Sequence, residues 1–288
     1  MKEKIGIIGV GNWGTKCFNT LQDMNYDVHG CFRDYIPMLE DNTIKSILIT
    51  SDASTHYEIA KKCLKYGKHI FVEKPITLSY KHTEELVNLG KKHKKVVMSG
   101  DTLHTFNPAI KKIKHDFDYC MFGRPFKSIS YCTGGPRRDD INPMWEYCPH
   151  DISMLMYIVN EVPEVKSVVI TDNMSKLELY FPQNNMFAEC YGGWGIKEKQ
   201  RSFFLSCDRY DSGFYEYPKR TLFYTNRITN KSKKKYISDT KPLTEELKCF
   251  LGLVYETEEN NKYYSCPYYN GLYTTYVLEE AQKLWDKE

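Results

Sequence analysis

The chain has 288 residues, enough for one large domain or two moderate ones, and its 40 basic and 37 acidic residues leave a net charge of only +3. This balance argues against nucleic acid as a partner, and the apolar runs are too short to cross a bilayer. The start of the chain is interrupted by glycines and is not typical of an export signal. The ten cysteines form no C-x-x-C pair, so we expect reduced thiols in a cytoplasmic protein and no bound metal.

The first hundred residues alternate strands and helices. Helical spacing of apolar residues follows the first, third and fourth strands, with Gly67 and Ser79 as expected capping residues. Only residues 33–45 separate the second strand from the third, enough for a turn or one short helix. This alternation predicts a parallel sheet covered by helices on both faces. The expected strands are 4–10, 27–32, 46–50, 69–72 and 96–100.

The pattern changes after Asn107-Pro108, where a capping residue and a proline at the first helical position predict a helix start. Beyond about residue 125 the strands follow one another, which predicts a second, mostly antiparallel domain. One strong helix, at 151–159, interrupts them, and a last helix is expected at about 273–286. The basic run KSKKKY, at 231–236, is expected to be a solvated loop or a strand edge, with a nucleic-acid contact as the minor alternative. The strands of this part are expected at 127–133, 165–171, 177–181, 186–194 and 201–207.

The sequence GVGNWG, which starts at Gly9, fits the pattern G-x-G-x-x-G. The pattern is weak alone, but here it follows a strand and opens a helix. Gly9 permits the tight turn, Gly11 lets a pyrophosphate approach the backbone, and Gly14 lets helix and strand pack closely. Asn12 and Trp13 open the helix, whose free N–H groups favour phosphates. We therefore expect a dinucleotide here rather than a merely tight turn.

The adenosine ribose is bound at the end of the second strand in folds of this kind, and there the sequence has Phe32-Arg33-Asp34. Arg33 at the ribose position favours NADP, whereas Asp34 at that position favours NAD. Both alternatives stay open, as does an ordinary surface role for Arg33.

The segment TSDASTHYEIAKKCLKYGKHIFVEKPITLS, at 50–79, resembles the core of the glucose–fructose oxidoreductase and inositol dehydrogenase family (Gfo/Idh/MocA). Its most specific feature is the Glu-Lys-Pro tripeptide at 73–75. LHTFNPAIKKI, at 103–113, is similar to the stretch that leads into the family's inter-domain helix. MWEYCPHDISMLMYI, at 144–158, resembles the Asp-x-x-x-His motif of its second domain. Together, and in this order, the three segments are specific for the family.

The resemblance implies an α/β chain of two domains. The first, residues 1–120, is a Rossmann domain that binds NAD or NADP. The second, residues 121–288, is an α+β domain with a large, mostly antiparallel open sheet for substrate binding and oligomerisation, and the last helix packs back on the first domain. The exposed face of that sheet commonly forms a dimer or tetramer in the family, which suits the 23 tyrosines and 14 phenylalanines of this chain.

The resemblance also implies that Lys74 lies beside the nicotinamide and the reacting sugar carbon, and makes it the expected catalytic residue. A partly buried lysine near an oxidised, positively charged nicotinamide holds its own proton less tightly and can accept the proton of an alcohol. The alternative is a surface lysine paired with Glu73. The resemblance further suggests a cis bond before Pro75. The cofactor-binding residues expected after the third and fourth strands are Thr50, Ser51, His56, Glu73 and Lys74.

His150 is the second expected catalytic residue, at the start of a helix that begins at Asp151, where the helix dipole keeps the ring neutral. Glu146 takes the place of the family's Asp, so we expect it to contact sugar hydroxyls with altered geometry. His104 and Asn107 are expected to face the substrate, although Asn107 serves equally well as a helix cap. Lys74, His104, Asn107, Glu146 and His150 are thus the expected substrate-binding residues.

The leading hypothesis is a cytoplasmic NAD(P)-dependent dehydrogenase or reductase of a sugar or sugar-nucleotide hydroxyl or ketone. The Pro-His-Asp variant of the second motif resembles family members that oxidise the 3-hydroxyl of UDP-N-acetylglucosamine-type substrates. The alternative is a catalytically inactive dinucleotide-binding sensor or assembly protein of the same fold. Residues 33–45 motivate this alternative, because they leave no room for the full helix that the family usually carries there.

Overall fold

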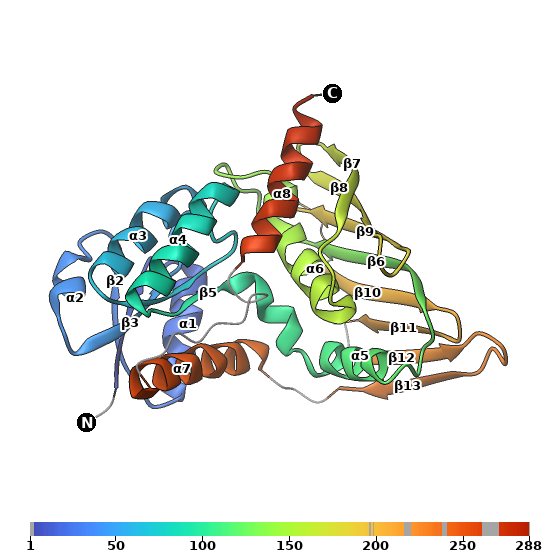
Figure 1. Cartoon of the computed structure of the whole chain (residues 1–288), viewed down its shortest axis with the longest axis horizontal. Coiled ribbons are helices and arrows are strands. Elements are labelled where there is room, and N and C mark those ends of the chain that lie inside the picture. The colour runs from blue at the N-terminus through green and yellow to red at the C-terminus, as the bar shows by residue number, and fades with distance from the viewer. Residues whose placement is uncertain are drawn as a thin grey trace. The chain divides into compact units, whose positions relative to one another are not determined.

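The computed structural model (Figure 1) describes residues 3–195, 197, 199–215, 220–237, 241–260 and 271–287. The chain forms two compact units. The first consists of Met1–Leu103 and Lys241–Thr275, and the second of His104–Thr240 and Tyr276–Glu288. The last part of the sequence therefore contributes to both units, whereas the sequence analysis expected one boundary, after residue 120.

The first unit contains a parallel sheet, which in the described residues has five strands in the order β2-β1-β3-β4-β5. The five expected strands and their parallel pairing are confirmed. Residues 33–45 form one short helix, α2, of five residues, as the sequence predicts. The elements are β1 (Lys4–Ile8), α1 (Asn12–Asp23), β2 (Asp27–Cys31), α2 (Ile36–Glu40), β3 (Ile44–Ile49), η1 (Ala53–Thr55), α3 (His56–Lys65), β4 (His69–Val72), α4 (Tyr80–His93), β5 (Val97–Ser99), η2 (Gly100–Phe106), which continues into the second unit, and α7 (Pro242–Asn260).

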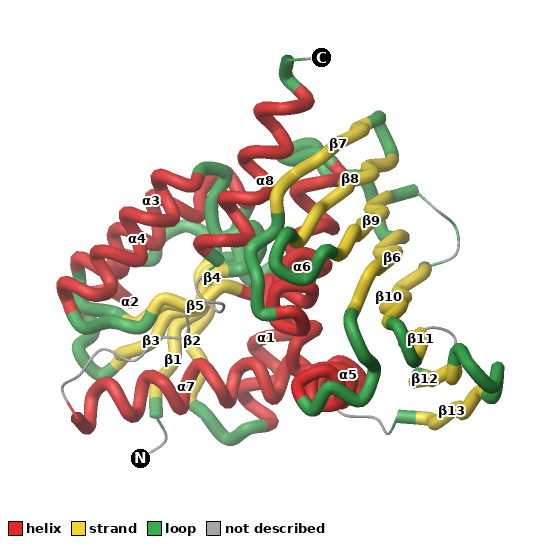
Figure 2. The backbone as a smooth tube through the Cα atoms, turned by 45° about the vertical axis from the view of Figure 1, so that its right-hand side comes forward, coloured by secondary structure: helices red, strands yellow, loops and turns green. Residues whose placement is uncertain are grey.

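Helices cover both faces of this sheet, with α3 and α4 on one side and α1 and α7 on the other (Figure 2). The central strand β3 is a nearly continuous apolar run in which Ile47, Leu48 and Ile49 are fully buried. Such runs are expected where a strand has no solvent-facing side. Ser79 occupies the N-cap position of α4, but its side chain makes no capping hydrogen bond, so only half of that expectation holds.

Helix α7, which the sequence did not predict, is attached to the start of β4 by a polar cluster around the buried His69. His69 Nδ1 accepts a hydrogen bond from the Val96 N–H (3.1 Å), so Nε2 carries the ring proton and donates it to Glu258 of α7 (2.8 Å). The same carboxylate forms ion pairs with Lys95 (2.5 Å) and Lys45 (3.0 Å). Burial lowers the pKa of His69 to about 4, which keeps the ring neutral in this arrangement.

The second unit contains a sheet with the strand order β13-β12-β11-β10-β6-β9-β8-β7, eight strands among the described residues. β6 and β9 pair in parallel and the other neighbours are antiparallel, so the mostly antiparallel sheet is confirmed. The run KSKKKY forms β13, an exposed edge strand, and the sequence missed β11 and β12. The elements are α5 (Pro108–Asp118), β6 (Pro125–Thr133), α6 (Pro143–Val159), β7 (Glu164–Ile170), β8 (Met174–Phe181), β9 (Met186–Gly193), β10 (Gln200–Cys207), β11 (Tyr210–Tyr215), β12 (Thr221–Asn226), β13 (Ser232–Tyr236) and α8 (Leu272–Trp285), whose first residues belong to the first unit.

Helix α6 lies across one face of the second sheet (Figure 2). Small side chains on the central strand β6, Ser128, Ser130 and Cys132, point to this face and are buried. Gly192 of β9 has no room for a side chain, because a Cβ there would lie 2.7 Å from Tyr147 Cβ of the helix. This close packing fixes the position of the α6 side chains.

In the described ranges, no helix combines the length and the apolar character that crossing a membrane requires.

Candidate active site

The carboxyl ends of all five strands in the first sheet lie at one edge. The register pairs Ile8 of β1 with Cys31 of β2 and with Ile49 of β3, and it continues from Ile49 to Val72 of β4 and from Val72 to Ser99 of β5. The strand order reverses between β1 and β3, and open α/β sheets bind ligands at such a point. The glycine-rich turn, the Arg33 turn and the Glu-Lys-Pro tripeptide each follow one of these strands, so the fold brings them to the same edge.

The glycine-rich turn has the geometry that a dinucleotide requires. Gly9 has a φ of +98°, and its N–H donates a hydrogen bond to the Cys31 carbonyl (2.8 Å). A Cβ on Gly14 would lie 2.6 Å from Thr50 Oγ1, so this glycine permits the close packing of α1. In contrast, among the described residues and apart from the chain next to Gly11, no atom lies within 4 Å of the position that a Cβ on Gly11 would take. The backbone at Gly11 is therefore open to a phosphate, in front of the N-terminus of α1.

The predicted cofactor residues after β3 make contacts between loops. Thr50 Oγ1 donates a hydrogen bond to the Gly9 carbonyl (2.5 Å), and Ser51 Oγ lies 2.8 Å from Thr55 Oγ1. His56 is buried, with Nδ1 2.8 Å from the Pro75 carbonyl and Nε2 3.0 Å from the Ser51 carbonyl. These side chains join the turns that follow β1, β3 and β4. Direct contact with a cofactor stays a prediction for all three.

Arg33 and Asp34 are both exposed in the turn between β2 and α2. Phe32, just before them, is 71% exposed, so the turn presents one aromatic and two charged side chains at the strand-end edge. Both charged side chains are therefore accessible at the end of β2.

The Glu-Lys-Pro tripeptide joins the turn after β4 to the glycine-rich turn. The Lys74–Pro75 peptide bond is cis. Glu73 is only 8% exposed; its carboxylate accepts a hydrogen bond from the Trp13 indole N–H and another from the backbone N–H of Lys74 (3.2 Å). Lys74 itself is half-buried. Glu73 is thus held by protein donors on both oxygens, and it connects α1 to the backbone of the lysine.

Two further carboxyl groups are buried in the same unit, and the sequence analysis missed both. Glu246 of α7 is fully buried and accepts a hydrogen bond from Thr102 Oγ1 (3.0 Å). Burial raises its pKa well above the ordinary range, and the negative charge of Glu73 adds to this effect. Burial also raises the pKa of Asp101 to about 6. The signal for Glu246 was weak, because it lies on a helix that the sequence did not predict.

In the second unit, helix α6 begins at Pro143 and not at Asp151, which corrects the expectation for His150. Asn142 caps the helix by accepting a hydrogen bond from the Trp145 N–H (3.1 Å), and Pro149 lies inside the helix. The sequence suggested a start after Pro149 because proline usually stands at helix ends. His150 therefore lies in the middle of the helix, and the argument from the helix dipole was wrong.

Glu146 and His150 are one helical turn apart on α6 and so lie on the same side of the helix. Glu146 Oε2 accepts a hydrogen bond from Arg138 Nη1 (3.0 Å), and Arg138 also pairs with Asp140. The Glu146 side chain is thus held by a guanidinium from the loop after β6.

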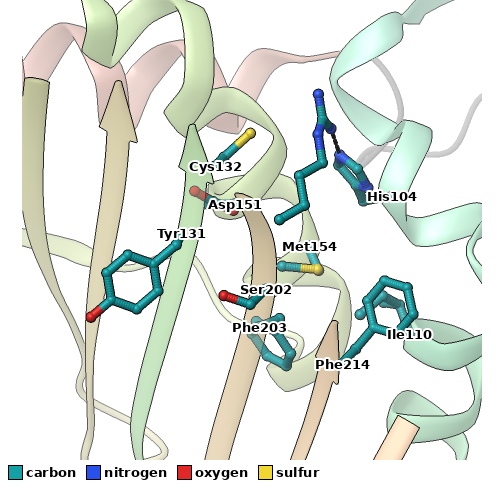
Figure 3. Close-up of a pocket in the computed structure, with 10 residues that line it drawn as sticks. His104, Ile110, Tyr131, Cys132, Asp151, Met154, Ser202, Phe203 and Phe214 are labelled. Carbon is teal, nitrogen blue, oxygen red and sulfur yellow. Dashed lines mark hydrogen bonds between the residues drawn. The ribbon is translucent and has the colours of Figure 1, made fainter. Parts of the chain in front are cut away.

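His104 and His150 come together although they are far apart in the sequence. Their ring centroids are 4.7 Å apart and the ring planes cross at 85°. His104 also forms a hydrogen bond with Arg201 Nη1, drawn as a dashed line in Figure 3. Sequence analysis did not single out Arg201, since a lone arginine in a strand carries no signal.

Asn107 forms the helix cap that the sequence offered as an alternative. Its Oδ1 accepts a hydrogen bond from the Ala109 N–H of α5 (2.9 Å), and the side chain is buried. The expected contact of Asn107 with a substrate stays a prediction. Among the described residues, no group of three or more His, Cys, Asp or Glu side chains is arranged to hold a metal ion.

Comparison with known proteins agrees with this fold and these motifs. Residues 23–101 match the family GFO_IDH_MocA, described as an oxidoreductase family with an NAD-binding Rossmann fold. This match includes the Glu-Lys-Pro tripeptide and confirms the resemblance to the family.

Two curated relatives illustrate the range of similarity. The chain is 26% identical over 204 residues to the myo-inositol 2-dehydrogenase of Thermotoga maritima, covering 60% of this chain and 61% of that one. It is 23% identical over 148 residues to the UDP-N-acetylglucosamine 3-dehydrogenase of Acidithiobacillus ferrooxidans, covering 49% and 46%. The alignments thus span less than two thirds of the length of either relative.

Solved structures match over nearly the whole chain. The 3-ketoreductase of Actinomadura kijaniata, solved with TDP-benzene and NADP, superposes with a TM-score of 0.81 at 12% identity, covering 99% of this chain and 98% of that one. A structure of the Acidithiobacillus ferrooxidans UDP-N-acetylglucosamine 3-dehydrogenase superposes with a TM-score of 0.81 at 18% identity, covering 99% and 97%. At these identities the likeness establishes the two-part fold.

Proposed function

We propose that the protein is an NAD(P)-dependent oxidoreductase that transfers a hydride between a nicotinamide and a hydroxyl or ketone of a sugar or sugar nucleotide. The observation that carries the proposal is the common edge of the first sheet. There the open backbone at Gly11 follows β1 and the half-buried Lys74 follows β4 of the same parallel sheet. Glu73 connects the two turns through Trp13. A dinucleotide on the glycine-rich turn fits this edge.

The chain's own residues then handle the proton. The nicotinamide, when bound, supplies or accepts the hydride. Lys74 Nζ takes the proton of the alcohol during oxidation and returns it during reduction. The Glu73 carboxylate holds the Lys74 backbone through its N–H (3.2 Å), which limits the positions open to the amine. In the second unit, His150 orients the substrate hydroxyl and shares in the proton transfer, and Glu146 contacts a neighbouring hydroxyl.

Relatives that act on ring hydroxyls support a cyclic secondary alcohol as the substrate. One is named as a myo-inositol 2-dehydrogenase and another as a UDP-N-acetylglucosamine 3-dehydrogenase. We propose a sugar nucleotide, with the 3-hydroxyl of a UDP-N-acetylhexosamine as the first substrate to test and myo-inositol as the comparison. The direction of the reaction and the choice between NAD and NADP belong to the same test.

The test combines native mass spectrometry with a turnover assay. We expect the purified protein to retain a dinucleotide, whose mass distinguishes NAD from NADP. We expect absorbance at the reduced-nicotinamide wavelength to change when UDP-N-acetylglucosamine is added with the matching cofactor. A protein that retains or binds no dinucleotide would contradict the proposal.

The second candidate is a catalytically inactive dinucleotide-binding sensor or assembly protein. The observation that favours it is helix α2, whose five residues replace a full helix beside the exposed Arg33 turn. It predicts dinucleotide binding without turnover of any sugar or sugar nucleotide, and binding that is indifferent to substitutions at Lys74 and His150.

We also propose a homo-oligomer, a dimer or tetramer, that associates through the sheet face opposite α6. Aromatic pairs gather on that face: Tyr131 stacks on Tyr191 at 4.8 Å, and Phe204 meets Tyr215 at 5.2 Å. Phe187 of β9 is 55% exposed. An aromatic surface of this kind suits a second copy of the chain, and light scattering during size-exclusion chromatography measures the assembly.

A cytoplasmic location completes the proposal. Nine of the ten cysteines lie in the described residues, and all nine are free thiols. Free thiols are typical of a reducing compartment, which supports the cytoplasm.

A further inference from the structure

Arg201 of β10 fixes the protonation of His104. An arginine side chain has only donors, so its hydrogen bond to His104 Nε2 requires that this nitrogen accept. A nitrogen that accepts a hydrogen bond carries no proton. The ring of His104 is therefore neutral, with its single proton on Nδ1. The positive guanidinium beside the ring also opposes a second proton by direct repulsion.

His104 in turn contacts the ring of His150. The two rings meet edge to face, with centroids 4.7 Å apart and an interplanar angle of 85°. His150 is 4% exposed and lies in the middle of α6, where helix packing limits its rotamers. A neutral His104 offers either a ring edge or a ring face to this contact, whereas two imidazolium rings at this distance would repel each other.

Asp151 supplies the reason for a guanidinium at this place. Its carboxyl is buried, and Oδ2 has no hydrogen-bond partner among the described residues. Asp151, His104 and Arg201 line one small pocket (Figure 3). Burial raises the pKa of Asp151 to about 7, while Ser130 and the positive charge of Arg201 pull it down. Arg201 therefore lines the same pocket as a buried carboxyl and forms a hydrogen bond with an imidazole.

We propose that Arg201 is a positioning residue, which holds His104 as the neutral Nδ1–H form and through that ring fixes the plane of His150. The proposal rests on the proposed function in one respect, namely that His150 takes part in proton transfer. The titratable groups around Arg201 in the described residues come from three elements and are His104 of η2, Tyr131 and Cys132 of β6, and Asp151 and Tyr147 of α6; His150 contacts the ring of His104.

The test uses the full-length protein with ¹⁵N-labelled histidine and follows the ring nitrogens by NMR between about pH 6 and 8, the range in which histidine ordinarily titrates. In the wild type, His104 Nε2 should stay unprotonated throughout this range. In Arg201→Met, His104 should gain a second proton within it. Arg201→Lys keeps the charge but loses the planar fork, so it should restore the neutral ring in part. Arg227→Met is the matched control, because Arg227 is an exposed arginine in the turn after β12 of the same sheet and pairs with Asp211.

The kinetic readout is separate. In Arg201→Met we expect kcat to fall about tenfold, with KM nearly unchanged, and the acid limb of the pH profile to move upward by about one unit. A His104 signal that titrates identically in wild type and Arg201→Met would overturn the proposal whether or not the protein has turnover.

If Arg201→Met does not fold, the variant His104→Gln provides the test. The ring signals of His150 should shift and broaden in this variant, and unchanged His150 signals would contradict the proposal. A wild type without turnover refutes the proposed function but leaves the NMR result to decide the role of Arg201.

Discussion

The strand-end edge of the first unit and the histidine cluster of the second are built in different ways. At the edge, each functional residue belongs to a short motif that directly follows a strand, and the parallel register alone brings the motifs together. In the cluster, η2, α6 and β10 each contribute one side chain, His104, His150 and Arg201. A local motif survives many changes elsewhere in the chain, whereas the cluster depends on the packing of α6 against its sheet. The comparison teaches that the strand-end edge can be predicted from sequence and tolerates substitutions elsewhere in the chain. The histidine cluster cannot be predicted in this way and is sensitive to such substitutions.

The largest expected effect is a loss of turnover at the strand-end edge while the fold of this edge stays intact. Lys74→Ala should lower kcat about 10³-fold, equivalent to about 4 kcal/mol in the barrier, because the proton acceptor is lost. Dinucleotide affinity should persist, since the glycine-rich turn is unchanged. Steady-state kinetics and a fluorescence titration with the cofactor measure the two quantities. Lys65→Ala, at an exposed position of α3, is the control and should behave as wild type. Full turnover in Lys74→Ala would remove the mechanism.

A second prediction concerns the start of β4, at the other end of the strand from the Glu-Lys-Pro tripeptide. There His69 binds Glu258 of α7. Burial lowers the pKa of His69 to about 4. The unfolded chain binds that proton near the ordinary value of 6.5, so stability present above pH 6.5 is lost as the pH falls toward 4. The loss should reach about 2–3 kcal/mol. Burial alone would raise the pKa of Glu258, but Lys95 and His69 lower it to about 2, so a further loss follows as the pH falls below 4.5.

Urea unfolding between pH 7.5 and 4 measures this loss. His69→Gln should flatten the profile, because Gln can accept from the Val96 N–H and donate to Glu258 without titrating. His29→Gln, at an exposed histidine of β2, is the control and should keep the wild-type slope. Identical slopes in wild type and His69→Gln would show that His69 does not carry the effect.

A matched pair of glycines sharpens the account of the edge. In Gly14→Ala the new methyl group would lie 2.6 Å from Thr50 Oγ1, so the free energy of unfolding should fall by about 1–3 kcal/mol. In Gly11→Ala the methyl group meets open space, so stability should change by less than about 0.5 kcal/mol while dinucleotide affinity falls. Thermal unfolding and cofactor titration separate the two. Equal stability losses would mean that Gly11 is not open.

The smallest expected effect tests the cofactor choice. Arg33→Ala should weaken NADP about tenfold and leave NAD nearly unchanged, because the exposed guanidinium is lost from the end of β2. Asp34→Ala is the matched variant and should weaken NAD instead if Asp34 holds the ribose. Calorimetric titration with both dinucleotides measures the ratio. An unchanged ratio in both variants would place the ribose elsewhere.

Most of the first unit was predictable because its signals are local. Apolar runs marked its strands, and the Gly9 and Gly14 positions follow from the steric needs of one turn. The start of α6 was not predictable in the same way, since Pro149 sits inside a helix that is held by packing against Gly192 and by the Asn142 cap. The role of Arg201 could not be predicted, because its contact with His104 joins residues about a hundred positions apart and leaves no local pattern in the sequence.

The resemblance carried the roles of Lys74 and His150, whereas residue patterns alone gave the sheet and the dinucleotide turn. The buried carboxyls of Glu246 and Asp151 illustrate what neither source reveals. A carboxyl in an apolar helix reads as a surface residue until the surrounding elements are in place, because burial is a property of the fold and not of the local sequence.

The most direct measurement is the position of one amine in a crystal structure with bound dinucleotide. The account predicts that Lys74 Nζ lies within about 4 Å of the nicotinamide ring and at hydrogen-bonding distance from a substrate hydroxyl. A dinucleotide bound on the glycine-rich turn with that amine directed into bulk water, away from the pyridine ring, would contradict it.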